Sequence, residues 1–161
     1  MEEKKKVFVE TSVVSYLVAR PSSDLLKMAR QVATQEWHEN AAPKLSLFAS
    51  ELVREEASQG DAEAAVKRLE FIRNFQMLVI DATVIDLAEK LLKETAVPRT
   101  SFDDAVHIAT AAVSRMDFLL TWNCKHIANP VTRPIIRRTC EKYGYIYPEI
   151  CTPLELKGYD L

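Results

Sequence analysis

Glu10, Glu56 and Asp104 are acidic residues at positions where an apolar or ligand-facing side chain is expected. A carboxylate on the buried side of an element is costly unless it is paired, hydrogen-bonded or bound to a metal. Clustered carboxylate oxygens suit hard divalent cations such as Mg²⁺ and Mn²⁺, which also bind phosphate oxygens. The chemistry to consider first is therefore that of a divalent metal site.

Glu56 is selected by helical spacing. In the segment 50–57 it follows Val53 by three residues and Leu52 by four, which places it on the apolar side of a helix. Glu55 shares its stripe with Glu51 and is predicted to be solvated. Glu56 is therefore the glutamate that requires a partner.

The same spacing selects Asp104, which lines up with Ile108 and is predicted to face inward. Asp103 lines up with His107 on a stripe predicted to face outward, and no catalytic role is expected of His107. A structural alternative stays open, because Ser101 and Asp104 have the spacing of a capping box and acids suit a first helical turn.

Glu10 ends the apolar run 7–9, at a point where a buried strand stops. Its alternative role is that of a polar strand end. Further strands are predicted at 45–49, 77–80, 118–121 and 149–151. Helices are predicted from about 13 to 17, 24 to 40, 50 to 74 with a break near Gly60, 83 to 95, 102 to 115 and 134 to 143. Strands that alternate with helices indicate an α/β fold with a mostly parallel sheet, whose ligands bind beyond the carboxyl ends of the strands.

The composition limits the class of protein. The 161 residues are 48% apolar and fit a single domain spanning 1–161. The longest apolar runs are too short to cross a bilayer, so we expect a cytoplasmic protein without membrane contact. The net charge of −2 argues against a general nucleic-acid coat, and the basic stripe with Arg133 and Arg137 is expected to be a solvated helix face. Three cysteines without metal spacing are expected to be reduced, structural thiols.

Four segments in order resemble the PIN-domain ribonucleases over nearly the full length of the chain. They are Val7 to Ser12, Ser50 to Gly60, Asp104 to Ala111 and Leu119 to His126. The resemblance implies a PIN-like three-layer α/β/α domain with a mostly parallel central sheet. It also implies that Glu10, Glu56 and Asp104 are the catalytic metal ligands. Helical spacing selects Glu56 and Asp104 independently, and Glu10 is selected by its place at the end of a strand.

The resemblance assigns further roles and marks two departures. Ser12 and Thr121 are expected to orient water or substrate, and Asn123 takes the last catalytic position. The first acid of this family is usually aspartate, so Glu10 is one methylene longer. Asn123 is neutral, which removes one charge that would help to hold a second ion.

The resemblance implies a divalent-metal-dependent endoribonuclease that hydrolyses RNA phosphodiester bonds and leaves a 3′-hydroxyl and a 5′-phosphate. Such a protein is expected to be the toxin of a toxin-antitoxin pair, silenced by a small antitoxin. A homodimer is also expected, with an apolar surface formed by Leu25, Met28, Val32 and Trp37.

Three alternatives remain open. One is a PIN-like module that binds RNA or protein with weakened or lost catalysis. Another is a phosphoacceptor domain that uses Asp81, which ends a predicted strand. Near the last site position, Trp122 either stacks on a base or packs locally, and Lys125 or His126 either contacts phosphate or serves local structure.

Overall fold

The computed structural model describes residues 2–158. Within them five strands form one sheet in the order β3-β2-β1-β4-β5, and every neighbouring pair is parallel. The strands are β1 (Lys6–Val9), β2 (Ser46–Ser50), β3 (Gln76–Leu78), β4 (Phe118–Leu120) and β5 (Glu149–Cys151). The predicted parallel α/β fold is therefore confirmed. Among the strands, the boundary that moves most is the end of β3, which stops two residues before the predicted end at residue 80.

Helices follow the strands at nearly the predicted places. They are α1 (Thr11–Val18), α2 (Leu25–Asn40), α3 (Glu51–Ala57), α4 (Ala62–Ile72), α5 (Ala82–Lys93), α6 (Phe102–Val113), α7 (Arg133–Lys142) and α8 (Pro153–Leu156), with a short 3₁₀ turn η1 (Ala42–Lys44). The break near Gly60 is confirmed: Gly60 has φ +82°, which favours glycine, and Asp61 caps α4. The 3₁₀ turn and α8 are too short to leave a periodic signal in the sequence.

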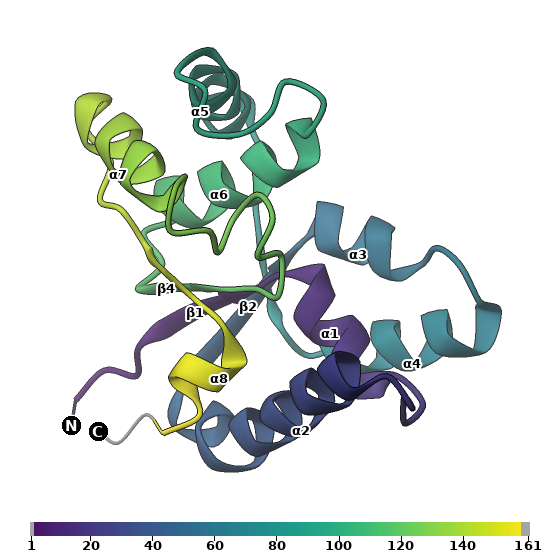
Figure 1. Cartoon of the computed structure of the whole chain (residues 1–161). Helices are drawn as coiled ribbons and strands as arrows, with labels where there is room; N and C mark the ends of the chain where they lie inside the picture. Colours follow the sequence, from purple (N-terminus) through teal and green to yellow (C-terminus); the bar gives the residue numbers. More distant parts are fainter. Residues whose placement is uncertain (1, 159–161) are drawn as a thin grey trace.

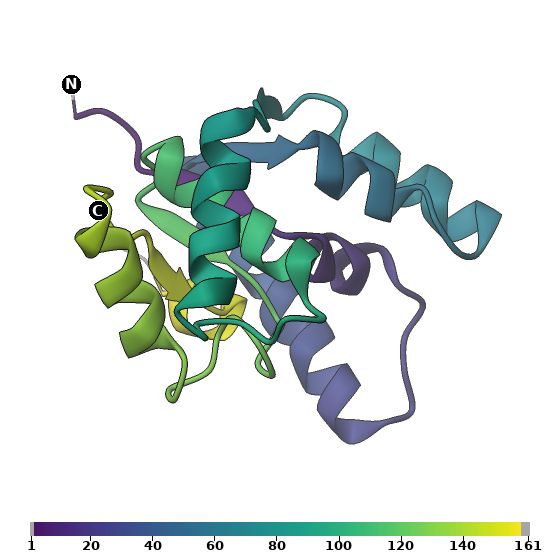
Figure 2. The ribbon, with the colours of Figure 1, turned by 90° about the horizontal axis from the view of Figure 1, so that it is seen from above.

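The helices cover both faces of the sheet (Figure 1). α5, α6 and α7 lie on one side, and α1, α2, α4 and α8 lie on the other. Figure 2 looks onto the layer that contains α5, α6 and α7. Because both faces are covered, Val7, Phe8 and Val9 of the central strand are fully buried. The architecture is the three-layer α/β/α arrangement that the resemblance implies.

The order of the strands places a topological switch at β1. From β1 the chain moves through β2 to β3 on one side of the sheet, and β4 and β5 are then added on the other side. In open parallel sheets the crevice at such a switch, outside the carboxyl ends of the strands, is where ligands bind. The fold therefore directs attention to the residues after β1, β2 and β4.

The predicted dimer surface is only partly available. Leu25, Met28 and Val32 of α2 are exposed, but Trp37 is fully buried. The prediction for Trp37 is wrong because it lies five residues after Val32, which is about 140° further around the helix, on a side of α2 that is buried in the core. In residues 2–158 no helix is long and apolar enough to cross a membrane, and all three cysteines are free thiols.

Candidate metal centre

Glu10 lies directly after β1, at the switch point of the sheet. Its backbone N–H donates to the carbonyl of Leu120 at 3.0 Å, which joins it to the end of β4. Glu10 is also the residue that caps α1. Its side chain is only 6% exposed although it is acidic. A carboxylate buried to this degree needs hydrogen-bond donors around it.

Those donors come from Ser12 and Thr121. Oε2 of Glu10 accepts a hydrogen bond from the Thr121 hydroxyl at 2.8 Å and from the Ser12 backbone N–H at 3.2 Å. It also accepts one from the Ser12 hydroxyl. The Ser12 oxygen in turn accepts the backbone N–H of Trp122 at 2.8 Å. Ser12 and Thr121 therefore hold Glu10 in one orientation.

Glu56 approaches from α3, the helix that follows β2. It is partly buried, whereas Glu55 is exposed, so the choice between them is confirmed. Oε1 of Glu56 accepts a hydrogen bond from the Thr11 hydroxyl at 2.7 Å and lies 2.7 Å from Nε2 of His107. Burial raises the pKa of Glu56, but the hydrogen bond and positive charge of His107 and the bond from Thr11 outweigh it, so the net pKa is lowered.

His107 is the residue of this centre that helical spacing placed wrongly. Its side chain is 1% exposed and points toward Glu56, although it shares a stripe with the exposed Asp103. The reason is that α6 is covered by α5 on one side and by the sheet on the other, so every residue from 105 to 112 is buried. The apolar residues on both sides of His107 in the sequence are the signal of a helix buried all round.

The pKa of His107 is raised by its surroundings. Burial alone would lower it, but the hydrogen bond to Glu56 and the negative charges of Glu10, Glu56 and Asp104 outweigh burial. The imidazole ring of His107 is oriented with Nε2 toward the carboxylates. Its Nδ1 is buried without a hydrogen-bond partner in the described part of the chain.

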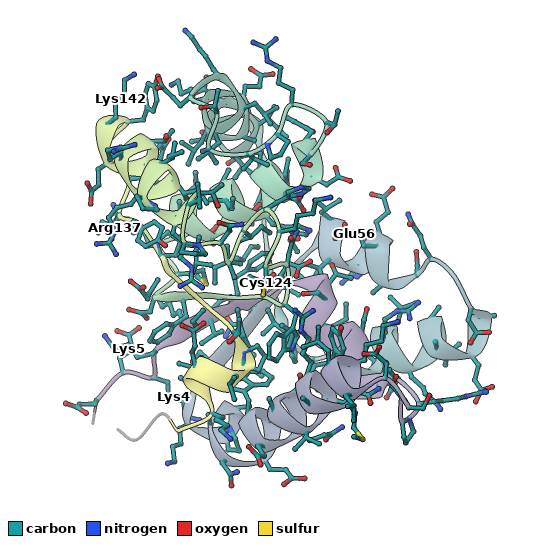
Figure 3. All side chains as sticks on the ribbon, viewed as in Figure 1. Lys4, Lys5, Glu56, Cys124, Arg137 and Lys142 are labelled. Carbon is teal, nitrogen blue, oxygen red and sulfur yellow. The ribbon has the colours of Figure 1, made fainter. Side chains whose placement is uncertain are left out.

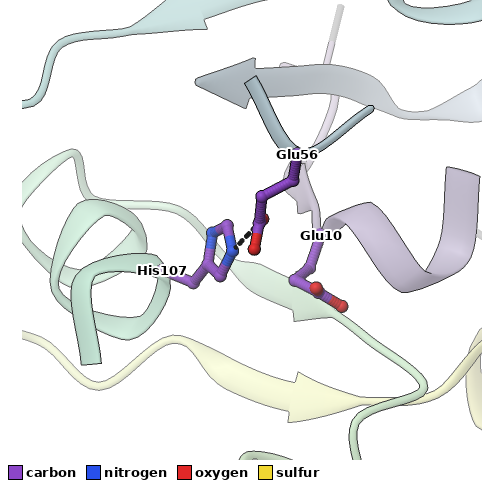
Figure 4. Close-up of side chains that lie close together, drawn as sticks. All are labelled: Glu10, Glu56 and His107. Carbon is purple, nitrogen blue, oxygen red and sulfur yellow. Dashed lines mark hydrogen bonds and ion pairs between the residues drawn. The ribbon is translucent and has the colours of Figure 1, made fainter. Parts of the chain in front are cut away.

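Glu10, Glu56 and His107 together form a cluster with the donor atoms that a metal requires (Figure 4). One ligand atom from each lies within 4.8 Å of the others. Oε1 of Glu10 and Oε2 of Glu56 accept no hydrogen bond from residues 2–158, while the second oxygen of each is held by the scaffold. Two fixed carboxylates with one uncommitted oxygen each suit a divalent cation.

Asp104 faces the same cleft as Glu56 but makes different contacts. It lies at the first turn of α6 and, unlike the exposed Asp103, is partly buried, as predicted. Oδ1 accepts a hydrogen bond from Asn123 Nδ2 at 3.0 Å, and Oδ2 accepts one from His126 Nδ1 at 2.7 Å. Of the three predicted ligands, the structure thus brings Glu10 and Glu56 into one cluster. Asp104 lies beside them with both oxygens engaged.

Asn123 and His126 together fix Asp104. Asn123 donates to Asp104 with its amide nitrogen and accepts the backbone N–H of His126 with its oxygen at 3.0 Å. The hydroxyl of Ser101 lies 3.2 Å from His126 Nδ1 and makes no capping bond to α6. The capping-box alternative for Ser101 and Asp104 is therefore wrong.

The cleft has room for a ligand. Its volume is about 370 Å³, and its lining consists of Glu56, Thr100, Ser101, Phe102, Asp103, Asp104 and His126. Three of these seven residues are acidic and none is lysine or arginine. Without a bound cation, such a lining repels a phosphate group. An anionic substrate would therefore need a metal ion in this cleft.

Trp122 serves local packing, which was one of its two predicted roles. Its side chain is 7% exposed, and its indole N–H donates to the Thr34 hydroxyl at 2.8 Å. The guanidinium of Arg30 lies 5.3 Å from the indole ring. Trp122 therefore ties β4 to α2 and offers no open face to a base.

The basic residues of α7 are occupied elsewhere. Arg137 pairs with Glu149 at 3.3 Å, and Arg133 lies 3.6 Å from Glu155. Figure 3 shows Arg137 and Lys142 on α7, well separated from Glu56. Arg137 and Lys142 are exposed and ion-paired, in line with the solvated helix face that the sequence favours. Arg133 is only partly exposed, and its Nε is buried without a hydrogen-bond partner in residues 2–158.

Asp81, the proposed phosphoacceptor, is the cap of α5. Its carboxylate accepts the backbone N–H of Val84 at 3.1 Å. It follows the edge strand β3, away from the switch point between β1 and β4. Helix capping accounts for its position after a strand.

Comparisons with known proteins identify the family and the fold of the chain. The PIN domain family matches residues 7–123, which is more than half of the chain and includes every predicted site residue. Among solved structures, the chain is similar to the crystal structure of VapBC2 from Rickettsia felis bound to a DNA fragment from their promoter. The TM-score is 0.52 at 12% identity, covering 91% of this chain and 98% of the other. No curated protein sequence matches the chain. At this identity, the structural likeness concerns the fold alone.

Proposed function

The chain belongs to the PIN-domain family, and we propose that it is a divalent-metal-dependent endoribonuclease, the toxin of a toxin-antitoxin pair. One observation carries the proposal: Glu10 and Glu56 are fixed by the scaffold at the switch point, and each keeps one oxygen uncommitted. Placing the buried Glu10 carboxylate beside the partly buried Glu56 costs stability, and a bound cation would offset that cost.

In this proposal Glu10, Glu56 and Asp104 hold Mg²⁺ or Mn²⁺. When bound, the ion supplies a Lewis acid for the scissile phosphate and favours hydroxide formation from water at neutral pH. Ser12 and Thr121 keep Glu10 in place, Thr11 keeps Glu56 in place, and Asn123 orients Asp104. The hydroxyls of Ser12 and Thr121 point at Glu10. In this proposal the two residues therefore affect the substrate indirectly, by positioning the Glu10 carboxylate.

Two matched pairs of variants test the proposal. Purified protein is incubated with RNA and Mn²⁺, and cleavage rates are compared for Asp104→Asn against Asp103→Asn and for Glu56→Gln against Glu55→Gln. We expect the cleft variants to lose about 10²-fold or more in rate, as for other groups that stabilise transition-state charge. The exposed neighbours should stay near wild type.

The ends of the products give a second readout. Metal-dependent hydrolysis by an attacking water leaves a 3′-hydroxyl and a 5′-phosphate, whereas attack by the ribose 2′-hydroxyl leaves a cyclic phosphate. Equal rates for Asp104→Asn and Asp103→Asn, or cyclic products, would refute the proposal.

The partners belong to the same proposal. The similar solved structure is titled as VapBC2 on promoter DNA, and we propose a small antitoxin for this chain too. We also propose a cytoplasmic homodimer, in which Leu25, Met28 and Val32 of α2 form the contact, because all three are exposed on one helix. Sedimentation of the chain alone should give a dimer that Leu25→Ser with Val32→Ser converts to a monomer, while Val66→Ser on α4 leaves it intact.

A binding module is the second candidate. This candidate is favoured by the contacts of Asp104. Both of its oxygens are bonded, to Asn123 and His126, and in this second reading neither binds a metal. Such a protein would bind RNA without cleaving it in Mn²⁺, and Asp104→Asn would leave the affinity for RNA unchanged.

A further inference from the structure

His107 is a polar side chain in a place where the fold could use an apolar one. It is 1% exposed, lies between Val106 and Ile108 on a helix buried all round, and its ring lies 5.9 Å from that of Phe8. A buried imidazole and carboxylate pair is often no more stabilising than apolar residues of similar volume. Packing therefore gives no reason for a histidine at this position.

The hydrogen bonding of His107 is also incomplete. Nε2 lies 2.7 Å from Oε1 of Glu56, but Nδ1 is buried and has no partner within residues 2–158. Buried polar atoms in folded proteins are nearly always bonded, and an exception calls for a functional explanation. The imidazole is thus aimed at the two carboxylates and is poorly bonded on its other side.

The distances fit coordination of one ion. Neighbouring ligands of an octahedral ion, each about 2.1 Å from it, lie roughly 3 Å apart. Nε2 of His107 and Oε1 of Glu56 are 2.7 Å apart. One ligand atom each from Glu10, Glu56 and His107 lie within 4.8 Å of one another. Coordination by Nε2 requires that the proton between it and Glu56 is released to solvent when the metal binds. With that proton gone, small side-chain movements would bring one nitrogen and two oxygens to a common ion.

We propose that His107 is a nitrogen ligand of the metal ion held by Glu10 and Glu56, so that this centre prefers Mn²⁺ or a similar transition ion to Mg²⁺. The inference rests on the proposed function, which places a metal at this cluster. An all-oxygen site suits Mg²⁺, whereas an imidazole nitrogen raises the affinity for first-row transition ions. His107 is in this way the residue that sets which cation the centre takes.

The test uses the whole chain with Mn²⁺ alone as the probe. Pulsed electron paramagnetic resonance detects nitrogen nuclei bound to Mn²⁺, and labelling the histidines with ¹⁵N identifies their contribution. We expect a histidine nitrogen coupling in the wild type and its loss in His107→Gln. The chain has three histidines, so His38→Gln with His126→Gln leaves His107 as the sole candidate and should keep the coupling.

The double variant keeps the test decisive even where His107→Gln does not fold. Bound Mn²⁺ without a histidine coupling in the wild type would overturn the inference. Loss of the coupling in a folded double variant that still binds Mn²⁺ would also overturn it; Mn²⁺ binding is measured in each variant because His126 contacts Asp104. In the first case, RNA cleavage that still depends on Glu56 would leave the proposed function standing. A wild type that binds no Mn²⁺ would overturn both.

Competition between cations gives an independent readout. The free Mn²⁺ signal is followed while Mg²⁺ is added to the wild type and to His107→Gln, which offers an amide oxygen in place of the nitrogen. We expect the affinity for Mn²⁺ to fall by roughly tenfold or more in the variant, and the affinity for Mg²⁺ to fall less. An unchanged ratio of the two affinities in a folded variant would contradict the selective role of His107.

Discussion

Each glutamate of the metal centre has one oxygen held by the scaffold and one that accepts no hydrogen bond within residues 2–158. One oxygen of Glu10 accepts hydrogen bonds from Ser12 and Thr121, and one oxygen of Glu56 is bonded to Thr11 and His107. Fixing a carboxylate before a ligand arrives lowers the entropy that binding must remove. The hydroxyls around the site therefore organise the ligands in advance.

Burial also controls the chemistry of the cysteines. Burial, followed by the charge of Glu141, raises the pKa of Cys140 to about 12, and burial, followed by the charges of Glu155 and Glu149, raises that of Cys151 to about 12. Only the thiolate is a nucleophile, and at pH 8 roughly 10⁻⁴ of such a thiol is ionised. Iodoacetamide should therefore label only the partly exposed Cys124 in the folded chain.

Mass spectrometry of the alkylated protein checks this expectation. In urea all three cysteines should be labelled, and native Cys124→Ser should take up almost no reagent. Labelling of Cys140 or Cys151 at the rate of Cys124 in the folded protein would contradict the stated effect of burial.

At the scale of the element, helical spacing predicts correctly which side chains face inward where a helix has one exposed face. α3 is such a helix, and Glu56 was correctly separated from Glu55. On α6 the same rule separated Asp104 from Asp103 at the exposed first turn but placed His107 outside, because the rest of α6 is covered on both sides. The nearly continuous run of apolar and small residues from 105 to 112 indicates a helix buried all round, and it overrides the stripe that His107 shares with Asp103.

The sequence indicated the order and type of nearly all elements because strands and helices alternate with clear periodicity. It could not indicate the contacts of His126 and Asn123 with Asp104, since these join α6 to the loop after β4 through side chains alone. The sequence could not decide between packing and base stacking for Trp122 for the same reason, because its partner Thr34 is 88 residues away in the chain. Long-range side-chain bonds leave no periodic signal.

The short helix α3 depends on its cap. The Ser50 hydroxyl accepts the Val53 backbone N–H at 3.2 Å and is fully buried. A helix this short has little stability of its own, so Ser50→Ala should lower the free energy of unfolding by about 1 kcal/mol. Because α3 carries Glu56, the same change should weaken Mn²⁺ binding.

Asp24→Ala is the matched control, since Asp24 caps α2 through the Lys27 backbone N–H at 2.9 Å, and α2 carries none of the proposed ligands. It should lower stability by a similar amount in urea titrations with EDTA and leave Mn²⁺ affinity unchanged. Equal effects of the two variants on Mn²⁺ affinity would mean that the cap of α3 does not position Glu56.

At the scale of the whole molecule, the centre joins elements that are distant in the chain. Glu10 follows β1, Glu56 lies on α3 and His107 lies on α6, so the cluster exists only when the sheet, α3 and α6 are assembled. A ligand that binds the folded state alone stabilises it by mass action. Metal binding and folding of this chain should therefore be coupled.

Thermal unfolding with and without Mn²⁺ measures this coupling. At an Mn²⁺ concentration of about 100 times Kd, the folded state should gain about 2.7 kcal/mol, which raises Tm by roughly 5 to 10 °C for a chain of this size. EDTA should reverse the shift. Glu56→Gln should lose most of it, because it removes a ligand charge, while Glu55→Gln should keep it. An equal shift in both variants would place the bound Mn²⁺ outside this cluster.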